Sequence, residues 1–461
     1  MTWKVRPVTL AVSAVPTARA EAAPLPLPEV PTVAGARLLV PLVDGTRVGY
    51  ANLDHAASAP CLDTVRDAVD ELLPWYASVH RGAGFASQVS TKVYEQARDV
   101  LRRFVGARRT DTVVFTRNTT DSLNLLARAV PKGTSVVLFD TEHHAALLPW
   151  RGPNVRRVEA PATAAETVPA LEAALRRCPE GPRLVVLTGA SNVTGELWPV
   201  AALAEVAHRY GARVVLDAAQ LAPHRPVRIG ELGVDYVAVS GHKLYAPFGG
   251  GALIGRADWL QAAEAYLVGG GATAQVVDHG DRLGVAWSAV PERHEAGSPN
   301  VVGAHALAVA CETLSANWDA VVLHERALFR RLRAGLASVP GLRALSLFEE
   351  DGDRVGVVSF TVDGIESGLV AAVLSAEYGI GVRDGAFCAH IATRRLLGRV
   401  GAGEQRAVRV SIGLGTTAEH VDRVVAALRT LVADGPGVAY AVVDGRWAPV
   451  EDTRPLPPFL A

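Results

Sequence analysis

The sequence is short of charge and has no excess of either sign. Only 20% of its 461 residues are charged, and 46 basic residues against 47 acidic ones leave a formal net charge of −1. A protein that binds nucleic acid or an anionic membrane surface through its charge needs a basic patch or block, and the sequence contains none. It therefore predicts neither a nucleic-acid partner nor a membrane partner.

Cysteine is also scarce, and long apolar runs are absent. The four cysteines lie far apart, at Cys61, Cys178, Cys311 and Cys388. Without paired spacing they predict neither a disulfide framework nor a zinc site, and they favour a reducing compartment. No apolar run is long enough to span a membrane, and Pro7 and Pro16 interrupt the mildly apolar start of the chain. We interpret that start as an extension rather than a signal peptide, and we expect a cytoplasmic protein without a metal site.

Apolar residues are plentiful, at 49% of the chain, which is enough for a large core. From Val113 onward, short β-branched runs alternate with amphipathic helical stretches. The runs expected to form buried strands read TVVFT, SVVLFD, RLVVLTG, RVVLDAA, VDYVAVS and GALIG. Strands that alternate with helices predict βαβ units, so the expected fold class is α/β with a mostly parallel sheet.

A change of pattern after Pro299 indicates a second, smaller domain. There a long helical stretch leads into a strand–helix–strand–helix pattern, which predicts a small α+β domain. The expected boundaries are an N-terminal extension over 1–48, a large domain over 49–310, a small C-terminal domain over 311–434 and a C-terminal extension over 435–461. Within the large domain, the segment 49–65 is expected to pack with the small domain.

Polar residues follow the predicted strands of the large domain. In open α/β sheets ligands bind beyond the carboxyl ends of the strands, so these residues are expected to meet at one site. In chain order they are Thr119, Thr120, His143, Asn192, Asp217, Gln220, Ser240, His242 and Lys243. Taken singly, most have a purely structural interpretation, such as a helix cap for the threonines or a surface position for the histidine. Their order, each set after its own strand, favours one site for pyridoxal phosphate.

Pyridoxal phosphate needs a lysine for a Schiff base, an acid beside its pyridine nitrogen, a flat group over its ring and an anion site for its phosphate. Lys243 meets the first need, because burial near His242 and a cationic ring would lower its pKa towards the reactive neutral amine. Asp217 meets the second need and His143 the third. The phosphate is assigned to residues that offer N–H groups or hydroxyls, with a helix N-terminus among them, namely Thr119, Thr120, Ser240 and His242.

Several longer segments resemble the signature segments of class V aminotransferase-fold enzymes, and most closely those of the cysteine desulfurase and selenocysteine lyase branch. They read NLDHAASAP, VHRGAGFAS, VFTRNTTDSLNLLA, EHHAALLPW, SNVTGE, LDAAQLAPH, SGHKLYAPFGGG and HEAGSPN. The resemblance runs from about Asn52 to about Leu431. It implies the pyridoxal-phosphate transferase fold type I, with a seven-stranded type of sheet, and a homodimer whose active sites lie at the subunit interface.

The resemblance also implies roles on the cofactor side of the site. Lys243 is assigned the Schiff base and His143 the ring stacking. Asp217 is assigned the pyridinium nitrogen and Gln220 the phenolate oxygen. The residues implied to hold the phosphate are Thr119, Ser240 and His242, with Ser288 near the place of a residue that the partner subunit contributes.

On the substrate side, Arg409 in VRVSIGL matches the arginine that binds the substrate carboxylate through a bidentate fork. The residues expected beside it are Asn192, Arg383 and His80. Cys388 in GVRDGAFCAH stands where the desulfurases keep their sulfur acceptor. The implied reaction cleaves the C–S (or C–Se) bond of a cysteine-type amino acid and leaves alanine and a persulfide on Cys388. A sulfur-acceptor protein is then an implied partner.

Some positions depart from the desulfurase pattern. Ala386 and Phe387 stand where the branch commonly carries two histidines, and Gly84 replaces another histidine. Asp384 brings an acid near Cys388, which would disfavour the thiolate. The alternatives that stay open are an aminotransferase, an epimerase or a C–S lyase of the same family, with Cys388 as a buried bystander. A protein that keeps the fold only as a partner or regulator is disfavoured, because every residue expected to face the cofactor is present.

Overall fold

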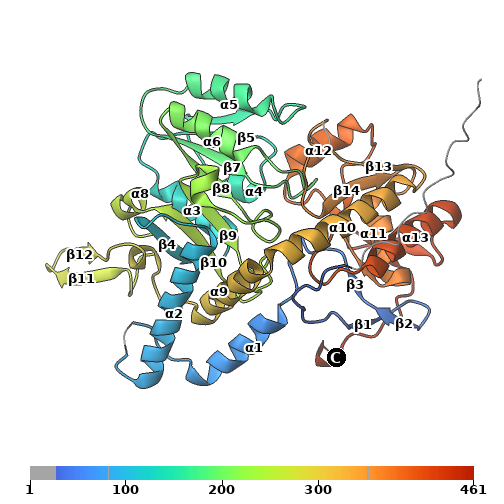
Figure 1. Cartoon of the computed structure of the whole chain (residues 1–461), viewed down its shortest axis with the longest axis horizontal. Helices are drawn as coiled ribbons and strands as arrows, with labels where there is room; N and C mark the ends of the chain where they lie inside the picture. Colours follow the sequence, from blue (N-terminus) through green and yellow to red (C-terminus); the bar gives the residue numbers. More distant parts are fainter. Residues whose placement is uncertain (1–26, 81, 350–351, 461) are drawn as a thin grey trace, which may run out of the picture.

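The computed structural model describes residues 27–80, 82–349 and 352–460. Two sheets of unequal size lie side by side, and helices α9 (Val301–Ala316) and α10 (Trp318–Ala337) run between them (Figure 1). The two helices are bent by 79° at their junction, where the sequence indicated one long helical stretch. No single described helix is long and apolar enough to cross a membrane, although this bent pair passes that test by length and composition.

The large sheet has seven strands in the order β4–β10–β9–β8–β7–β5–β6. Its strands are β4 (Asp111–Thr116), β5 (Ser135–Phe139), β6 (Val155–Val158), β7 (Arg183–Thr188), β8 (Ala212–Asp217), β9 (Tyr236–Ser240) and β10 (Gly251–Arg256). β10 runs antiparallel to both of its neighbours and the other pairs are parallel, which confirms the predicted mostly parallel sheet. β6 was not predicted, because the segment VRRV lies at the edge of the sheet and is only partly buried.

Helices cover both faces of the large sheet. They are α1 (Asp63–Leu72), α2 (Phe85–Phe104), α3 (Thr119–Ala129), α4 (His144–Leu147), α5 (Thr167–Arg176), α6 (Val200–Arg209), α7 (Ile229–Leu232) and α8 (Ala257–Ala262). Alternate residues of a strand point to opposite faces. In β5, Val137 and Phe139 therefore join the apolar cluster under α5 and α6, while Val136 and Leu138 join the one under α3. Burial on both faces leaves the strand ends as the place where polar side chains meet.

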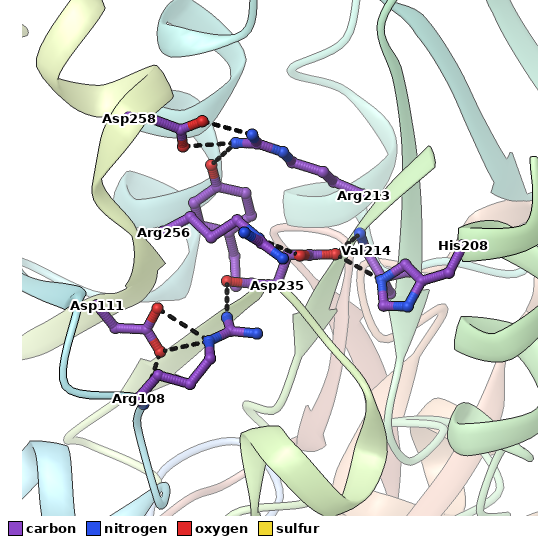
Figure 2. A network of polar contacts seen from close by, with 9 residues as sticks. Arg108, Asp111, His208, Arg213, Val214, Asp235, Arg256 and Asp258 are labelled. Carbon is purple, nitrogen blue, oxygen red and sulfur yellow. Dashed lines mark hydrogen bonds and ion pairs between the residues drawn. The ribbon is translucent and has the colours of Figure 1, made fainter. Parts of the chain in front are cut away.

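A buried carboxylate links three neighbouring strands of the large sheet. It lies at the end of the sheet opposite the carboxyl ends of the parallel strands. Asp235 immediately precedes β9, and Figure 2 shows the polar groups that converge on it. Its Oδ1 accepts from Arg256 Nε at 2.5 Å, and its Oδ2 lies 2.9 Å from both His208 Nε2 and the backbone nitrogen of Val214. Burial alone would raise the pKa of Asp235, but these donors outweigh it and hold the pKa below its usual range. The network fixes β8, β9 and β10 against one another.

The smaller sheet is antiparallel, in the order β13–β14–β17–β16. Its strands are β13 (Leu342–Ala344), β14 (Val357–Val362), β16 (Arg383–Gly385) and β17 (Ala407–Ser411), and its helices are α11 (Ser367–Tyr378), α12 (His390–Arg399) and α13 (Ala418–Asp434). The predicted α+β section is confirmed, with β14, α11, β17 and α13 as its strand–helix–strand–helix pattern. β13 and β16 were missed because each is a three-residue strand at a sheet edge.

Short strand pairs complete the described chain. They are β1 (Leu39–Pro41) with β2 (Arg47–Gly49), β3 (Ala51–Asn52) with β15 (Ile380–Gly381), β11 (Thr273–Asp278) with β12 (Leu283–Trp287), and β18 (Tyr440–Val443) with β19 (Arg446–Pro449). The parallel pair β3–β15 joins two distant segments beside the small sheet. The β11–β12 hairpin projects from the large domain, on the left of Figure 1.

Candidate active site

A cavity of about 240 Å³ lies beyond the carboxyl ends of the large-sheet strands, where the small sheet meets them. The predicted site residues that line it are Thr119, Thr120, His143, Asn192, Asp217, Gln220, Ser240, His242, Lys243, Arg383 and Arg409. The two arginines come from β16 and β17 of the small sheet, and the others come from the large domain. The structure therefore brings these residues together from both sheets.

Lys243 lies in the turn that follows β9. The turn is compact because Gly241 has no side chain: a Cβ there would lie 2.6 Å from the backbone oxygen of Gly250. The Nζ of Lys243 donates to Oε1 of Gln220 at 3.4 Å. Burial lowers the pKa of Lys243 to about 8, and the charge of Arg409 contributes to the same shift. A substantial fraction of the amine is therefore neutral near physiological pH.

Two buried carboxyl groups, those of Asp217 and Glu142, lie at or next to the cavity. Asp217 lines the cavity, and its Oδ1 accepts from the backbone N–H of Ala219 at 2.9 Å. Glu142 lies behind it and accepts from the backbone N–H of Thr188 at 3.0 Å. Burial, and then Asp217, raise the pKa of Glu142 well above its usual range, so Glu142 favours its neutral form. Burial also raises the pKa of Asp217, and a cation within the cavity would reverse that shift. No role was predicted for Glu142 from the sequence.

The N-terminus of α3 faces the cavity with the hydroxyls of Thr119 and Thr120 and with the N-cap residue Asn118. The backbone N–H of Thr119 donates to Ser240 Oγ at 2.8 Å, and that hydroxyl donates to Thr119 Oγ1 at 2.9 Å. Asn118 also lines the cavity and accepts from the backbone N–H of Asp121 at 3.0 Å. The threonines were predicted to lie at the site but Asn118 was not, although asparagine directly before a helical run is an ordinary N-cap signal. Hydroxyls and a helix N-terminus together are suited to an anion.

Two histidines at the cavity are neutral. His143 caps α4, where its Nδ1 accepts from the backbone N–H of Ala145 at 3.0 Å. Burial lowers the pKa of His143 to about 3, and Lys243 contributes to that shift. Burial and then Lys243 also lower the pKa of His242. His143 therefore presents a flat, uncharged ring to the cavity.

Arg409 is almost fully enclosed, with 1% of its surface exposed. Its Nη1 donates to the backbone oxygen of Asn192 and its Nη2 to Oδ1 of Asp54, each at 3.0 Å. The guanidinium also lies 5.1 Å from the ring centre of Phe387. Neither Asp54 nor Phe387 was predicted to have a role at the site. The available signal was an acid within the quoted segment NLDHAASAP, which is otherwise poor in charge.

Cys388 lies in the loop between β16 and α12, beside the residues that line the cavity but not among them. Its φ is 55° and that of Phe387 is 52°, a left-handed conformation that costs a residue with a side chain about 1–3 kcal/mol. Two contacts hold the loop: Asn192 Nδ2 donates to the Phe387 oxygen at 2.7 Å, and the His144 N–H donates to the Cys388 oxygen at 2.8 Å. Arg383 Nη2 lies 3.8 Å from the Cys388 sulfur.

The charged side chain next to the Cys388 thiol is the arginine Arg383, not the acid Asp384 that the sequence indicated. Asp384 Oδ2 accepts from Arg406 Nη2 at 2.5 Å and lines a second cavity beside the β18–β19 hairpin. Arg383, one residue earlier, is the residue whose side chain reaches the sulfur. Successive residues of a strand point to opposite sides, so nearness in sequence misled the prediction. The expectation that Asp384 would disfavour the thiolate is therefore corrected: Arg406 neutralises that acid, and a cation faces the thiol.

Besides Cys388, two predicted site residues do not line the cavity. His80 has its Nε2 3.0 Å from Oε1 of Glu95, on α2. Ser288 directly follows β12, at the base of the projecting hairpin, and its backbone N–H donates to the Ala272 oxygen at 2.8 Å. Within one chain, neither residue joins the others around Lys243.

The comparisons with known proteins agree with this geometry. The chain matches the Aminotransferase class-V family over residues 51–424. It is 32% identical over 405 residues to a probable cysteine desulfurase of Vibrio cholerae, covering 85% of this chain and 95% of that protein. It is 35% identical over 402 residues to a cysteine desulfurase of Dickeya dadantii, covering 84% of this chain and 93% of that protein.

Solved structures give the same result. The apo cysteine desulfurase of Thermococcus onnurineus NA1 superposes with a TM-score of 0.74 and 29% identity, covering 88% of this chain and 99% of that chain. An Escherichia coli cysteine desulfurase in its S-sulfonic acid form superposes with a TM-score of 0.71 and 31% identity, covering 83% and 94%. These families depend on pyridoxal phosphate, and the shared architecture confirms the predicted transferase fold type I. The chain belongs to the class V aminotransferase family.

Proposed function

We propose that the chain is a pyridoxal-phosphate-dependent cysteine desulfurase that moves sulfur, or selenium, from a cysteine-type amino acid onto Cys388. One observation carries the proposal: the Cys388 thiol lies 3.8 Å from the guanidinium of Arg383, and Arg383 also lines the cavity that contains Lys243. A thiol beside a cation, next to a buried amine of lowered pKa, suits nucleophilic sulfur transfer from an amino acid. The names of the relatives support the same reaction.

The residues around the cavity fit pyridoxal phosphate. Asp217 is a buried acid whose carboxylate accepts from the backbone N–H of Ala219, so it would gain from a protonated pyridine nitrogen. Lys243 would hold the aldehyde carbon of the cofactor, and His143 would cover its ring. The residues that would hold the phosphate are Thr119, Thr120, Ser240 and His242. When bound, the cofactor draws electrons from the α-carbon of the amino acid and so eases cleavage of neighbouring bonds.

Three residues then act on the substrate. Arg409 binds its carboxylate through the planar guanidinium and so orients the α-carbon towards Lys243. Lys243, as the neutral amine, takes the α-proton. Cys388, as the thiolate, attacks the substrate sulfur: the S–S bond forms as the C–S bond breaks, and the released carbon takes up a proton. Cysteine and the Cys388 thiol thus become alanine and a Cys388 persulfide, and the balance needs no external oxidant.

A C–S lyase, an aminotransferase or an epimerase of the same family is the second candidate. Cys388 itself does not line the cavity, whereas Phe387, 3% exposed, does. A cavity that Phe387 lines and Cys388 does not favours a reaction in which the cysteine takes no part.

The products formed from L-cysteine separate these candidates. With purified holoenzyme and a reductant, we expect alanine and sulfide in equal amounts. A C–S lyase would instead release pyruvate and ammonia with the sulfide, an aminotransferase would form the 2-oxo acid without sulfide, and an epimerase would form D-cysteine. A holoenzyme that makes alanine from neither cysteine nor selenocysteine would contradict the proposal.

Replacing Arg409 with lysine is expected to raise the KM for cysteine about 10- to 100-fold, because lysine keeps the charge but loses the planar fork. Initial rates of alanine formation over a range of cysteine concentrations measure this change. The matched control is Arg406→Lys, an exposed arginine on the far side of β16 that pairs with Asp384; its KM is expected to stay within about twofold of the parent value. An unchanged KM in R409K would contradict the role of Arg409 and indicate that Arg383 binds the substrate carboxylate instead.

We also propose a cytoplasmic homodimer with shared active sites, in which Ser288 meets the cofactor phosphate of the other subunit. The hairpin that ends at Ser288 exposes apolar side chains, with Val276 at 53% and Leu283 at 66% exposure. Such a projecting apolar element favours burial against a second copy. The four cysteines are free in the structure, which supports a reducing compartment.

A further inference from the structure

A second cavity, of about 560 Å³, lies between β16 of the small sheet and the β18–β19 hairpin. Helix α11 contributes Gly368, Ala371 and Ala372 to its lining, and the hairpin contributes Arg446 and Trp447. The hairpin follows the part of the chain that matches the family, which ends at residue 424. We call this space the side cavity; the reaction proposed above gives it no task.

The hairpin is fastened to α11 but not closed against β16. Trp447 Nε1 donates to Glu366 Oε2 at 3.1 Å, and the Tyr440 hydroxyl donates to Glu377 Oε1 at 3.0 Å. The Trp447 ring also lies close to Gly368, where a Cβ would be 3.0 Å from its Cδ1. A hairpin that served only to cover the small domain would pack against β16 as well. Instead it leaves a preformed hollow, with a volume in the range of about 300–1,000 Å³ that small-molecule sites have.

The charged groups that line the side cavity are satisfied unevenly. Each acid accepts a hydrogen bond from a neighbouring group; these acids are Glu366, Asp384 and Glu404. In the part of the chain that the structure describes, no acid pairs with Arg383 or Arg446, which lie on opposite walls. Arginines without an acid partner bind carboxylate or phosphate. A carboxylate suits this cavity better, because the acids nearby would repel the double charge of a phosphate.

Arg383 links the side cavity to the Cys388 thiol. It lines both the side cavity and the cavity that contains Lys243, and its Nη2 lies 3.8 Å from the Cys388 sulfur. The proposed reaction leaves a persulfide on Cys388, and a thiol has to remove the outer sulfur before the next turnover. The cofactor and the amino acid take up the cavity around Lys243, whereas the side cavity stays free for that thiol.

We propose that the side cavity binds a low-molecular-weight thiol of peptide size with a free carboxylate, and that this thiol accepts the sulfur from Cys388. The inference rests on the proposed function, because only that function places a persulfide on Cys388. The acceptor thiolate attacks the outer sulfur: a new S–S bond forms to the acceptor as the bond between that sulfur and Cys388 breaks. Cys388 leaves as a thiolate beside Arg383, the acceptor becomes a persulfide, and the exchange needs no further oxidant or reductant.

The test measures how fast small thiols discharge holoenzyme that has been loaded with sulfur by one turnover of cysteine. The probe is glutathione, a peptide thiol with two carboxylates and an ammonium group, and its diethyl ester masks both carboxylates. In the parent, the half-saturating concentration is expected to be at least about tenfold lower for glutathione than for the diester. Arg446→Gln is expected to raise the value for glutathione about 3- to 10-fold and to leave the value for the diester and the alanine formed during loading unchanged.

Two further variants separate the site from general effects on the enzyme. Arg394→Gln removes an exposed arginine of α12 outside both cavities and is expected to leave every value unchanged. Ala372→Phe fills the side cavity without changing its charge and is expected to slow discharge by glutathione at least about tenfold, with loading intact.

The outcomes distinguish the acceptor site from the proposed function. A parent enzyme that forms no alanine during loading would overturn the proposed function. The acceptor site would be overturned by a loaded parent that glutathione and the diester discharge equally well, or that only a protein thiol discharges. It would equally be overturned if Arg446→Gln left the half-saturating concentration of glutathione at the parent value.

Discussion

Replacing Lys243 with alanine is expected to lower the rate of alanine formation from cysteine by at least about 10³-fold, because one general base alone contributes about 10²–10⁴ and Lys243 is also proposed to hold the cofactor. Its amine is buried, and burial brings its pKa to about 8. Among the described residues that line the cavity, Lys243 is the only lysine, so no neighbouring amine can take over. Single-turnover formation of alanine by variant protein reloaded with cofactor measures the loss.

The matched control for this prediction is Lys132→Ala, at an exposed turn residue of the large domain. It removes the same charge and is expected to keep the parent rate and the parent visible spectrum. A second readout is retention of the cofactor during gel filtration, which is expected to weaken in Lys243→Ala alone. A Lys243→Ala protein with more than about a tenth of the parent rate would contradict a proton-transfer role, since a general base contributes at least about 10²-fold.

How far the sequence predicts this fold depends on how completely each strand is buried. β5, β7, β8 and β9 are covered on both faces, so they read as uninterrupted apolar runs and were predicted. β6, β13 and β16 lie at sheet edges and include exposed or charged residues, so they lack such a run. The sharp bend between α9 and α10 was also missed, because both sides of it read as helix.

In the candidate site, residues at the ends of strands could be predicted from the sequence, whereas contacts between segments far apart in the chain could not. Asp217 lies at the end of β8 and Lys243 in the turn after β9, both of which were predicted, and the topology of a parallel sheet brings such residues to one end of the sheet. Asp54 and Phe387 reach Arg409 from segments far apart in the chain, and only the packing of the two sheets reveals those contacts. The pKa of Glu142 is raised by burial and by the nearby Asp217, and the burial of a loop residue cannot be predicted from its sequence alone.

Replacing Cys388 with serine is expected to lower both alanine and sulfide formation by at least about 10²-fold, because a serine hydroxyl stays protonated where a thiolate must attack sulfur. The visible spectrum of the cofactor and its shift on addition of cysteine are expected to persist, since Cys388 does not line the cavity. Alanine, sulfide and pyruvate are measured together in the same reaction. The matched control is Cys61→Ser, a free, half-buried cysteine of the large domain, whose rates are expected to match the parent.

The outcome for Cys388→Ser also decides what the loop that carries Cys388 is for. Phe387 and Cys388 keep left-handed backbone conformations that cost free energy, and Asn192 and His144 hold them by hydrogen bonds to their carbonyl oxygens. If sulfur transfer is lost in the variant, that strained loop positions the thiol beside Arg383 for attack. If instead sulfide and pyruvate persist at the parent rate, the thiol takes no part, and the loop serves to seat the Phe387 ring against the Arg409 guanidinium, 5.1 Å away. The chain would then be a C–S lyase whose pocket is shaped by an aromatic ring where the desulfurases carry a histidine.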